Sequence, residues 1–148
     1  MWLANAIVPG SSVAAYEGTL LMGTPIRVLL VDDHAGLRKS LAALLRAEPD
    51  ITVVGEAANG QLAIEQALAL QPDVVLMDID MPVLNGIEAT RRLRAEAPGL
   101  HILGFSMHQE PALVQRIVEA GAVGFVGKAD PVETLLAAIW AVRSADGS

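Results

Sequence analysis

The chain has 148 residues, and 10 lysines and arginines against 17 aspartates and glutamates give a formal net charge of −7. Hydrophobic residues make up 53% and charged residues 18%, which excludes an intrinsically disordered protein and fits one domain with a sizeable core. The negative charge argues against a domain that binds nucleic acid by neutralising phosphates. The absence of cysteine excludes a disulfide framework, thiolate zinc sites and thiol catalysis.

The first 24 residues are the one part of the chain to which the sequence assigns no role. Residues 1–16 are fairly apolar, but they contain no basic residue and are interrupted by a Pro-Gly-Ser-Ser stretch, so they match a secretory signal poorly. No run reaches the roughly 18 apolar residues that a membrane span requires. We therefore predict an N-terminal extension over 1–24, one domain over 25–144, a short tail over 145–148, and a cytoplasmic location.

Strand-like and helix-like segments alternate from residue 26 onward. The predicted strands are short apolar runs rich in β-branched residues, at 26–31, 51–54, 73–77, 102–105 and 123–126. The first predicted helix carries Leu37, Leu41, Leu44 and Leu45 on one face and closes at Pro49. Start and stop signals bound the other helices, from Asn59 to Pro72, Ile87 to Pro98, Pro111 to Gly121, and Asp130 to about Arg143.

The pattern of the strands predicts the fold class. They are continuous apolar runs, so both faces of the sheet should be covered by helices. Alternation of strands and helices with short loops indicates a parallel sheet with right-handed crossovers. We therefore expect an α/β fold with an open, doubly wound, five-stranded parallel sheet, of the flavodoxin-like (βα)5 kind with strand order 2-1-3-4-5.

The residues that directly follow the predicted strands carry the candidate chemistry, because such sheets bind ligands at the carboxyl ends of their strands. Asp32 and Asp33 follow the first strand, Asp78 the third, Ser106 the fourth and Lys128 the fifth. Clustered carboxylates repel unless they protonate or hold a cation, and hard oxygen ligands suit Mg²⁺. A carboxylate can also attack phosphorus, and an ammonium and a hydroxyl can stabilise the transferring phosphoryl group. These residues therefore predict a phosphoryl-transfer site.

Four sequence pieces at the strand ends resemble the receiver domain of two-component response regulators. The pieces are VDDH at 31–34, MDIDMPVLNG at 77–86, GFSMH at 104–108 and GAVGFVGK at 121–128. The resemblance covers about residues 26 to 143. The sequence around 106–108 and 128–131 is most similar to the NarL/FixJ type of receiver.

The resemblance implies a phosphorylation switch that depends on a metal ion. Asp78 would take a phosphoryl group from the phosphohistidine of a sensor histidine kinase. Mg²⁺ would be bound by the side chains of Asp33 and Asp78, by the main-chain carbonyl of Asp80, and by Asp32 largely through water. The domain would not be an enzyme beyond its own phosphorylation and dephosphorylation.

The same resemblance implies how phosphorylation would change the conformation of the domain. Ser106 would rotate inward to the phosphoryl oxygen, Lys128 would pair with that oxygen, and Phe125 would follow the inward motion. Phe125 lacks the hydroxyl of the tyrosine often found at this position. The face formed by the fourth helix, fifth strand and fifth helix would then change its affinity for partners.

The remaining expectations concern partners. The apolar run over 135–140 motivates dimerisation on phosphorylation through the last strand and helix. We expect no direct nucleic-acid binding by this chain and no membrane contact, with control of transcription exerted by the full-length protein.

Two alternatives stay open. The first is a receiver that acts as a docking or dimerisation module without phosphorylation. The second is an aspartate-nucleophile phosphohydrolase of the haloacid dehalogenase kind, because Asp78-Ile79-Asp80 resembles that family's nucleophile motif. Against the second, the acids after Asp80 never pair up, and the chain is short for that family's cap.

Overall fold

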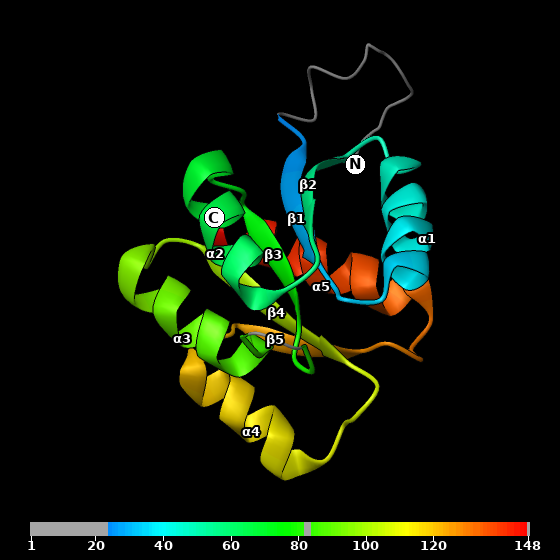
Figure 1. Cartoon of the computed structure of the whole chain (residues 1–148). Helices are drawn as coiled ribbons and strands as arrows, with labels where there is room; N and C mark the ends of the chain where they lie inside the picture. The colour runs from blue at the N-terminus through cyan, green and yellow to red at the C-terminus, as the bar shows by residue number, and fades with distance from the viewer. Residues whose placement is uncertain (1–23, 82–83, 148) are drawn as a thin grey trace.

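The structure is a computed structural model, and it describes residues 24–81 and 84–147. Five strands alternate with five helices along this part of the chain (Figure 1). The elements are β1 (Ile26–Val31), α1 (Ala35–Arg46), β2 (Ile51–Ala57), α2 (Gly60–Leu70), β3 (Val74–Asp78), α3 (Gly86–Glu96), β4 (His101–Ser106), α4 (Pro111–Ala120), β5 (Gly124–Gly127) and α5 (Val132–Gly147). The predicted N-terminal extension lies outside the described residues, apart from Thr24.

The strands form one parallel sheet in the order β2-β1-β3-β4-β5. The predicted doubly wound α/β fold is therefore confirmed. The chain moves outward from β1 to β2 and then returns to the other side of β1 for β3, β4 and β5. This reversal of direction between β1 and β3 is where such sheets place their ligand sites.

Two hydrophobic clusters lie on the two faces of the sheet. Buried residues of α2, α3 and α4 pack on one face with Leu29 and Val31 of β1. Buried residues of α1 and α5 pack on the other face with Val28 and Leu30. Successive residues of β1 thus enter opposite clusters, since side chains alternate along a strand. Burial on both faces explains why the central strands read as continuous apolar runs.

Local capping confirms several predicted helix ends. The Asn59 side chain accepts a hydrogen bond from Leu62 N at 2.9 Å, and Pro111 stands in the first turn of α4. Gly121 ends α4 with a φ of +124°, a conformation that L side chains rarely adopt. His34 caps α1 through Nδ1, which accepts from Leu37 N at 3.0 Å.

Other local predictions were wrong in detail. Leu44 is 52% exposed because α1 meets the sheet through a narrower face that includes Leu41 and Leu45. Asp130 does not cap α5: the helix begins at Val132, and the Asp130 carboxylate accepts from Gly127 N at 2.9 Å. Asp130 therefore shapes the loop that carries Lys128.

The apolar run over 135–140 serves mainly the core. Leu135, Leu136 and Ile139 are buried against the sheet, which leaves Trp140, 39% exposed, as its one large side chain at the surface. The run is therefore weaker support for a dimer interface than its sequence suggested. Among the helices of the described ranges, none is long and apolar enough to cross a membrane.

Candidate functional site

The strand-end residues predicted from the sequence meet at one edge of the sheet. Asp78 and Ser106 are the last residues of β3 and β4, and Asp32 and Lys128 directly follow β1 and β5. Lys128 N donates to the Ser106 carbonyl oxygen at 2.8 Å, which extends the pairing of β4 and β5 by one bond. The sheet itself therefore fixes the relative positions of these four residues.

Three carboxylates form the centre of this site. Asp32, Asp33 and Asp78 each offer one oxygen, and these oxygens lie within 4.8 Å of one another. Asp32 and Asp78 are each 1% exposed, whereas Asp33 is exposed. Two buried acids thus form the wall of the cluster and one accessible acid forms its rim.

The ammonium of Lys128 faces both buried acids. Its Nζ lies 2.8 Å from Asp32 Oδ2 and 3.2 Å from Asp78 Oδ2, and the side chain is 9% exposed. Neither of these oxygens has a well-oriented hydrogen-bond donor among the described residues. One ammonium therefore compensates two buried carboxylates only by charge, which leaves acceptor capacity for a further ligand.

The burial of these charges changes their pKa values. Burial raises the pKa of Asp78 from 3.8 to about 7, with a further contribution from the negative charge of Asp32, although Lys128 opposes the rise. Burial alone would lower the pKa of Lys128, but its close ion pair with Asp32 and the negative charge of Asp78 raise it above 10.5. Lys128 is therefore fully charged at neutral pH, while Asp78 is poised between its two forms.

Gly86 lets the next helix approach the end of β3. A Cβ at Gly86 would lie 2.1 Å from the Asp78 carbonyl oxygen, so a larger residue would displace the strand end. Gly86 N donates to the Ile79 carbonyl oxygen at 2.9 Å, and Asn85 caps α3 by accepting from Glu88 N. The Asn-Gly pair therefore brings α3 close to the backbone that carries Asp78.

Ser106 contacts the side chain of Asp80, a contact that the sequence did not predict. Ser106 is fully buried, and its Oγ donates to Asp80 Oδ2 at 3.4 Å and accepts from His108 N at 3.0 Å. His108 Nε2 lies 3.9 Å from the same Asp80 oxygen. In the receiver interpretation, the sequence assigned a role only to the main-chain carbonyl of Asp80. In this structure its carboxylate holds the Ser106 hydroxyl.

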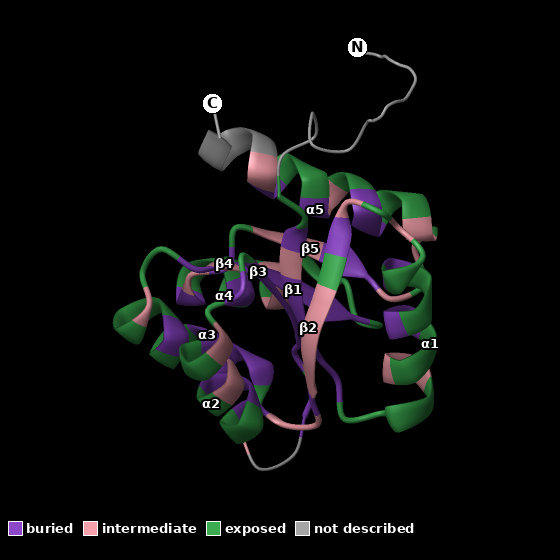
Figure 2. Cartoon of the chain, turned by 90° about the horizontal axis from the view of Figure 1, so that it is seen from above, coloured by how far each residue is buried: buried purple, intermediate pink, exposed green. Residues whose placement is uncertain are grey.

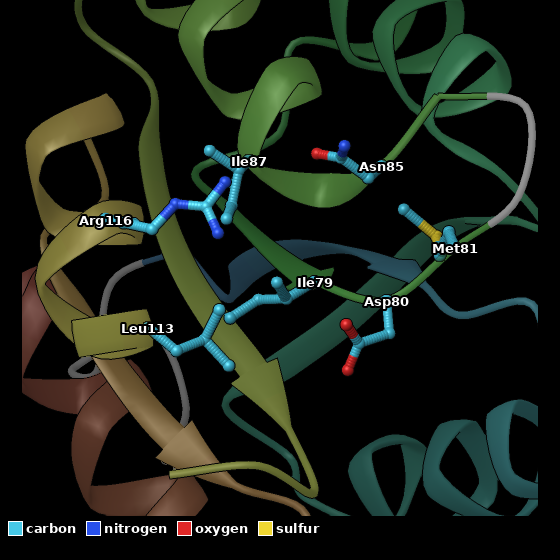
Figure 3. A pocket seen from close by; sticks show the side chains of 7 residues that line it. All are labelled: Ile79, Asp80, Met81, Asn85, Ile87, Leu113 and Arg116. Carbon is cyan, nitrogen blue, oxygen red and sulfur yellow. The ribbon is translucent and has the colours of Figure 1, made fainter. Parts of the chain in front are cut away.

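A cavity of about 380 Å³ lies beside Asp80, between the loop after β3 and helix α4 (Figure 3). Its lining comprises Ile79, Asp80, Met81, Asn85, Ile87, Leu113 and Arg116. Asp80 is the one residue that this cavity shares with the predicted site. The cavity therefore adjoins the carboxylate cluster without being part of it.

The donor set of the cluster fits a divalent cation. The fit rests on the two buried oxygens of Asp32 and Asp78 that lack donors, and on the third carboxylate of Asp33 within 4.8 Å. All of these ligands are hard oxygens, and the exposed rim leaves room for water, as Mg²⁺ requires.

Comparison with known proteins identifies the family. The family model described as "Response regulator receiver domain" matches residues 28–140. The chain therefore belongs to the receiver domains of two-component response regulators, as the strand-end motifs predicted. Receiver domains of this family interact with sensor histidine kinases and bind Mg²⁺ through an acidic pocket, and in this chain Asp32, Asp33 and Asp78 form an acidic cluster.

The relatives place the chain near the NarL/LuxR group. It is 41% identical to the nitrate/nitrite response regulator protein NarL of Escherichia coli over 115 residues, 78% of this chain and 53% of that protein. The crystal structure of a LuxR-family two-component response regulator from Aurantimonas sp. is similar with a TM-score of 0.79 and 38% identity, covering 82% of this chain and 87% of that chain.

Some of the matching relatives are enzymes and not transcription regulators. A protein-glutamate methylesterase/protein-glutamine glutaminase of Nocardioides sp. is 42% identical over 122 residues, which are 81% of this chain but 33% of that protein. The chain spans about half the length of the regulators it matches. The family thus includes transcription regulators and an enzyme, and it favours a receiver over the phosphohydrolase alternative.

Proposed function

We propose that this domain is a phosphorylation switch in which Asp78 accepts a phosphoryl group from the phosphohistidine of a sensor histidine kinase. The observation that carries the proposal is the position of Asp78 Oδ2, which is buried, lacks a hydrogen-bond donor among the described residues and lies 3.2 Å from Lys128 Nζ. An oxygen in this setting has a free lone pair and a fixed cation beside it, as a nucleophile toward phosphorus requires.

The transfer itself exchanges one bond for another. A carboxylate oxygen of Asp78 forms a bond to phosphorus while the bond between phosphorus and the donor imidazole nitrogen breaks, and that nitrogen keeps the electron pair and takes up a proton. Lys128 neutralises negative charge that develops on the phosphoryl oxygens. Because the pKa of Asp78 is about 7, the carboxyl group is only partly ionised at neutral pH. The positive charge of a bound cation would increase the fraction of Asp78 that is ionised and able to react.

The proposed metal ligands come from two strand ends, those of β1 and β3. Asp33 and Asp78 would bind Mg²⁺ by their side chains, Asp80 by its main-chain carbonyl, and Asp32 largely through water. When bound, Mg²⁺ supplies positive charge to the phosphoryl oxygens and to the carboxylates of the cluster. Asp80 N donates to Asp78 Oδ1 at 3.1 Å, which fixes one oxygen of the nucleophile.

Ser106 and Phe125 are the proposed switch residues. The Ser106 hydroxyl now donates to Asp80, and a phosphoryl group on Asp78 would offer it a more strongly charged acceptor. Phe125 is half-buried, and its ring lies over Gly104, where an added Cβ would come within 3.3 Å of it. Because Gly104 has no side chain, Phe125 and Ile117 pack closely on β4, two residues before Ser106.

The proposed output face combines α4, β5 and α5. Its exposed apolar side chains include Val118, Val123 and Trp140, at 48%, 51% and 39% exposure. We propose that phosphorylation changes the affinity of this face for a partner, including a second copy of the chain. The activity belongs in the cytoplasm with the kinase, and in the full-length protein it would regulate transcription, as the similarity to NarL supports.

The proposal is tested by intact mass spectrometry after incubation with Mg²⁺ and acetyl phosphate. We expect the native chain to gain one phosphoryl group, and the gain to disappear without Mg²⁺ or in Asp78→Asn. Asp73→Asn is a matched control, because Asp73 lies at the opposite edge of the sheet, where its carboxylate accepts from Arg27 N. No gain in the native chain would overturn the proposal in favour of a docking module that works without phosphorylation.

A further inference from the structure

The guanidinium of Arg38 joins the candidate site to the neighbouring strand. Arg38 belongs to α1, and its Nη1 donates to the Asp32 carbonyl oxygen at 2.6 Å. Its Nε donates to Glu56 Oε1 of β2 at 3.1 Å, and the side chain is 12% exposed. Figure 2 shows α1 beside β2, the two elements that the guanidinium bridges. One side chain thus connects α1 and β2 to the residue that follows β1.

The two adjacent acids of the cluster are held very differently. The Asp32 carboxylate accepts from His34 N at 2.8 Å and pairs with Lys128, and Asp32 N donates to Ala57 O at 3.0 Å. The Asp33 side chain is exposed and has no hydrogen bond or ion pair to any of the described residues. The place of the Asp33 carboxylate therefore depends on its backbone.

The relevant backbone is the peptide unit that links Asp32 to Asp33. The carbonyl oxygen of this unit is the acceptor of Arg38 Nη1. Glu56 holds the other side of the guanidinium, so the group is fixed at two points, which suits the planar fork of arginine and not the single ammonium of lysine. Rotation of this peptide unit would break the bond to Arg38 and turn Asp33 away from Asp78.

We propose that Arg38 is a positioning residue for the divalent cation: it locks the peptide unit between Asp32 and Asp33 and so keeps the Asp33 carboxylate within reach of Asp78. This inference rests on the proposed function, because it concerns the metal site of that function. Arg38 touches neither the cation nor the phosphoryl group in this role.

Electrostatics and positioning predict opposite effects of removing Arg38. Loss of a positive charge beside a cation site reduces repulsion, so charge alone predicts equal or tighter Mg²⁺ binding in Arg38→Ala. Loss of the Arg38 contact with the Asp32 carbonyl oxygen predicts weaker Mg²⁺ binding, because substitution of residues that support metal ligands typically lowers metal affinity by about 10–100-fold. A decrease in affinity therefore identifies positioning.

The chain offers a matched control on the same acid. Arg46 Nη2 lies 3.5 Å from Glu56 Oε2, its side chain is 54% exposed, and no hydrogen bond links it to Asp32. Arg46→Ala removes the same charge from the same ionic cluster and leaves the Asp32 carbonyl contact intact. We expect Arg46→Ala to bind Mg²⁺ within about twofold of the native affinity.

The experiment is a calorimetric Mg²⁺ titration of the native chain, Arg38→Ala and Arg46→Ala, with unfolding curves to confirm that each is folded. We expect the Mg²⁺ dissociation constant to rise by about tenfold in Arg38→Ala alone. In phosphorylation by acetyl phosphate, the half-saturating Mg²⁺ concentration should rise similarly, whereas the rate at saturating Mg²⁺ is retained. A general loss of structure would lower that rate as well.

Each outcome decides the inference. The inference is overturned if Arg38→Ala binds Mg²⁺ as tightly as the native chain or more tightly. It is also overturned if Arg46→Ala loses as much Mg²⁺ affinity as Arg38→Ala. If Arg38→Ala does not fold, Arg38→Lys decides: weaker binding than native supports the lock, and native binding overturns it, because lysine keeps the charge without the fork. A native chain that binds no Mg²⁺ would instead overturn the proposed metal site itself.

Discussion

Charged side chains have different surroundings at the two edges of the sheet, where the strands begin and where they end. At the amino ends of the strands, polar groups have ordinary partners: Arg27 N donates to Asp73 Oδ2 at 2.8 Å, Arg27 Nη1 donates to Gln71 O at 2.6 Å, and Arg143 donates to Thr24 O. At the carboxyl ends, Asp32 and Asp78 are buried side by side, and an oxygen of each lacks a hydrogen-bond donor in the described ranges.

This difference separates a stabilising arrangement from a functional one. Buried like charges raise the free energy of the folded state unless a ligand compensates them. Nothing about the fold requires them, since the opposite edge of the same sheet joins its strands and helices with partnered groups. The carboxyl edge therefore reflects selection for ligand binding and nucleophilic chemistry, at a cost in stability.

The largest effect on this comparison is expected from Lys128→Ala. Removal of the ammonium leaves the Asp32 and Asp78 carboxylates without their counter-ion, so we expect the free energy of unfolding without Mg²⁺ to fall by about 3 kcal/mol at neutral pH. At the other edge, Arg27→Ala should cost only about 1 kcal/mol, because water replaces the exposed contact. Urea unfolding measures both. Equal losses would show that the two edges are energetically alike.

Asp78→Asn should raise the free energy of unfolding, by less than Lys128→Ala lowers it. The substitution removes one of two adjacent buried charges and leaves Lys128 paired with Asp32, so we expect a gain in stability of about 1–2 kcal/mol without Mg²⁺. Asp73→Asn, at the amino edge, should bring no gain, since its acid is already satisfied by a backbone donor. A destabilised Asp78→Asn would mean that the pair with Lys128 outweighs the repulsion and burial.

The sequence predicted the site where the sheet alone determines it. Asp32, Asp78, Ser106 and Lys128 follow apolar strands, and a parallel sheet necessarily gathers the ends of its strands. Contacts made by long side chains across elements were missed. The clearest case is Arg38, which bridges an acid and a carbonyl from two other elements, because no local pattern records where its guanidinium lies.

The same limit applies to capping and to exposure. Asp130 has the local pattern of an N-cap, but its carboxylate accepts from the Gly127 amide, three residues earlier in the turn between β5 and α5. Leu44 fits the apolar spacing of α1, yet the face that α1 buries against the sheet includes Leu41 and Leu45 and leaves Leu44 at the surface. The exposure of Leu44 depends on tertiary packing and the contact of Asp130 on the conformation of a short turn, and periodicity encodes neither.

The last prediction is a pH dependence confined to the carboxyl edge. The pKa of Asp78 is about 7 in the folded chain against an ordinary 3.8, so between these values the folded state binds more protons than the unfolded state. Stability from this group is therefore full below about pH 4 and is lost as the pH rises through 7. Urea midpoints without Mg²⁺ should show Asp78→Asn gaining on the native chain between about pH 4 and pH 7, while Asp73→Asn stays parallel to it. Parallel curves for all three proteins would show that burial does not perturb Asp78, and the contrast between the two edges would then be one of geometry alone.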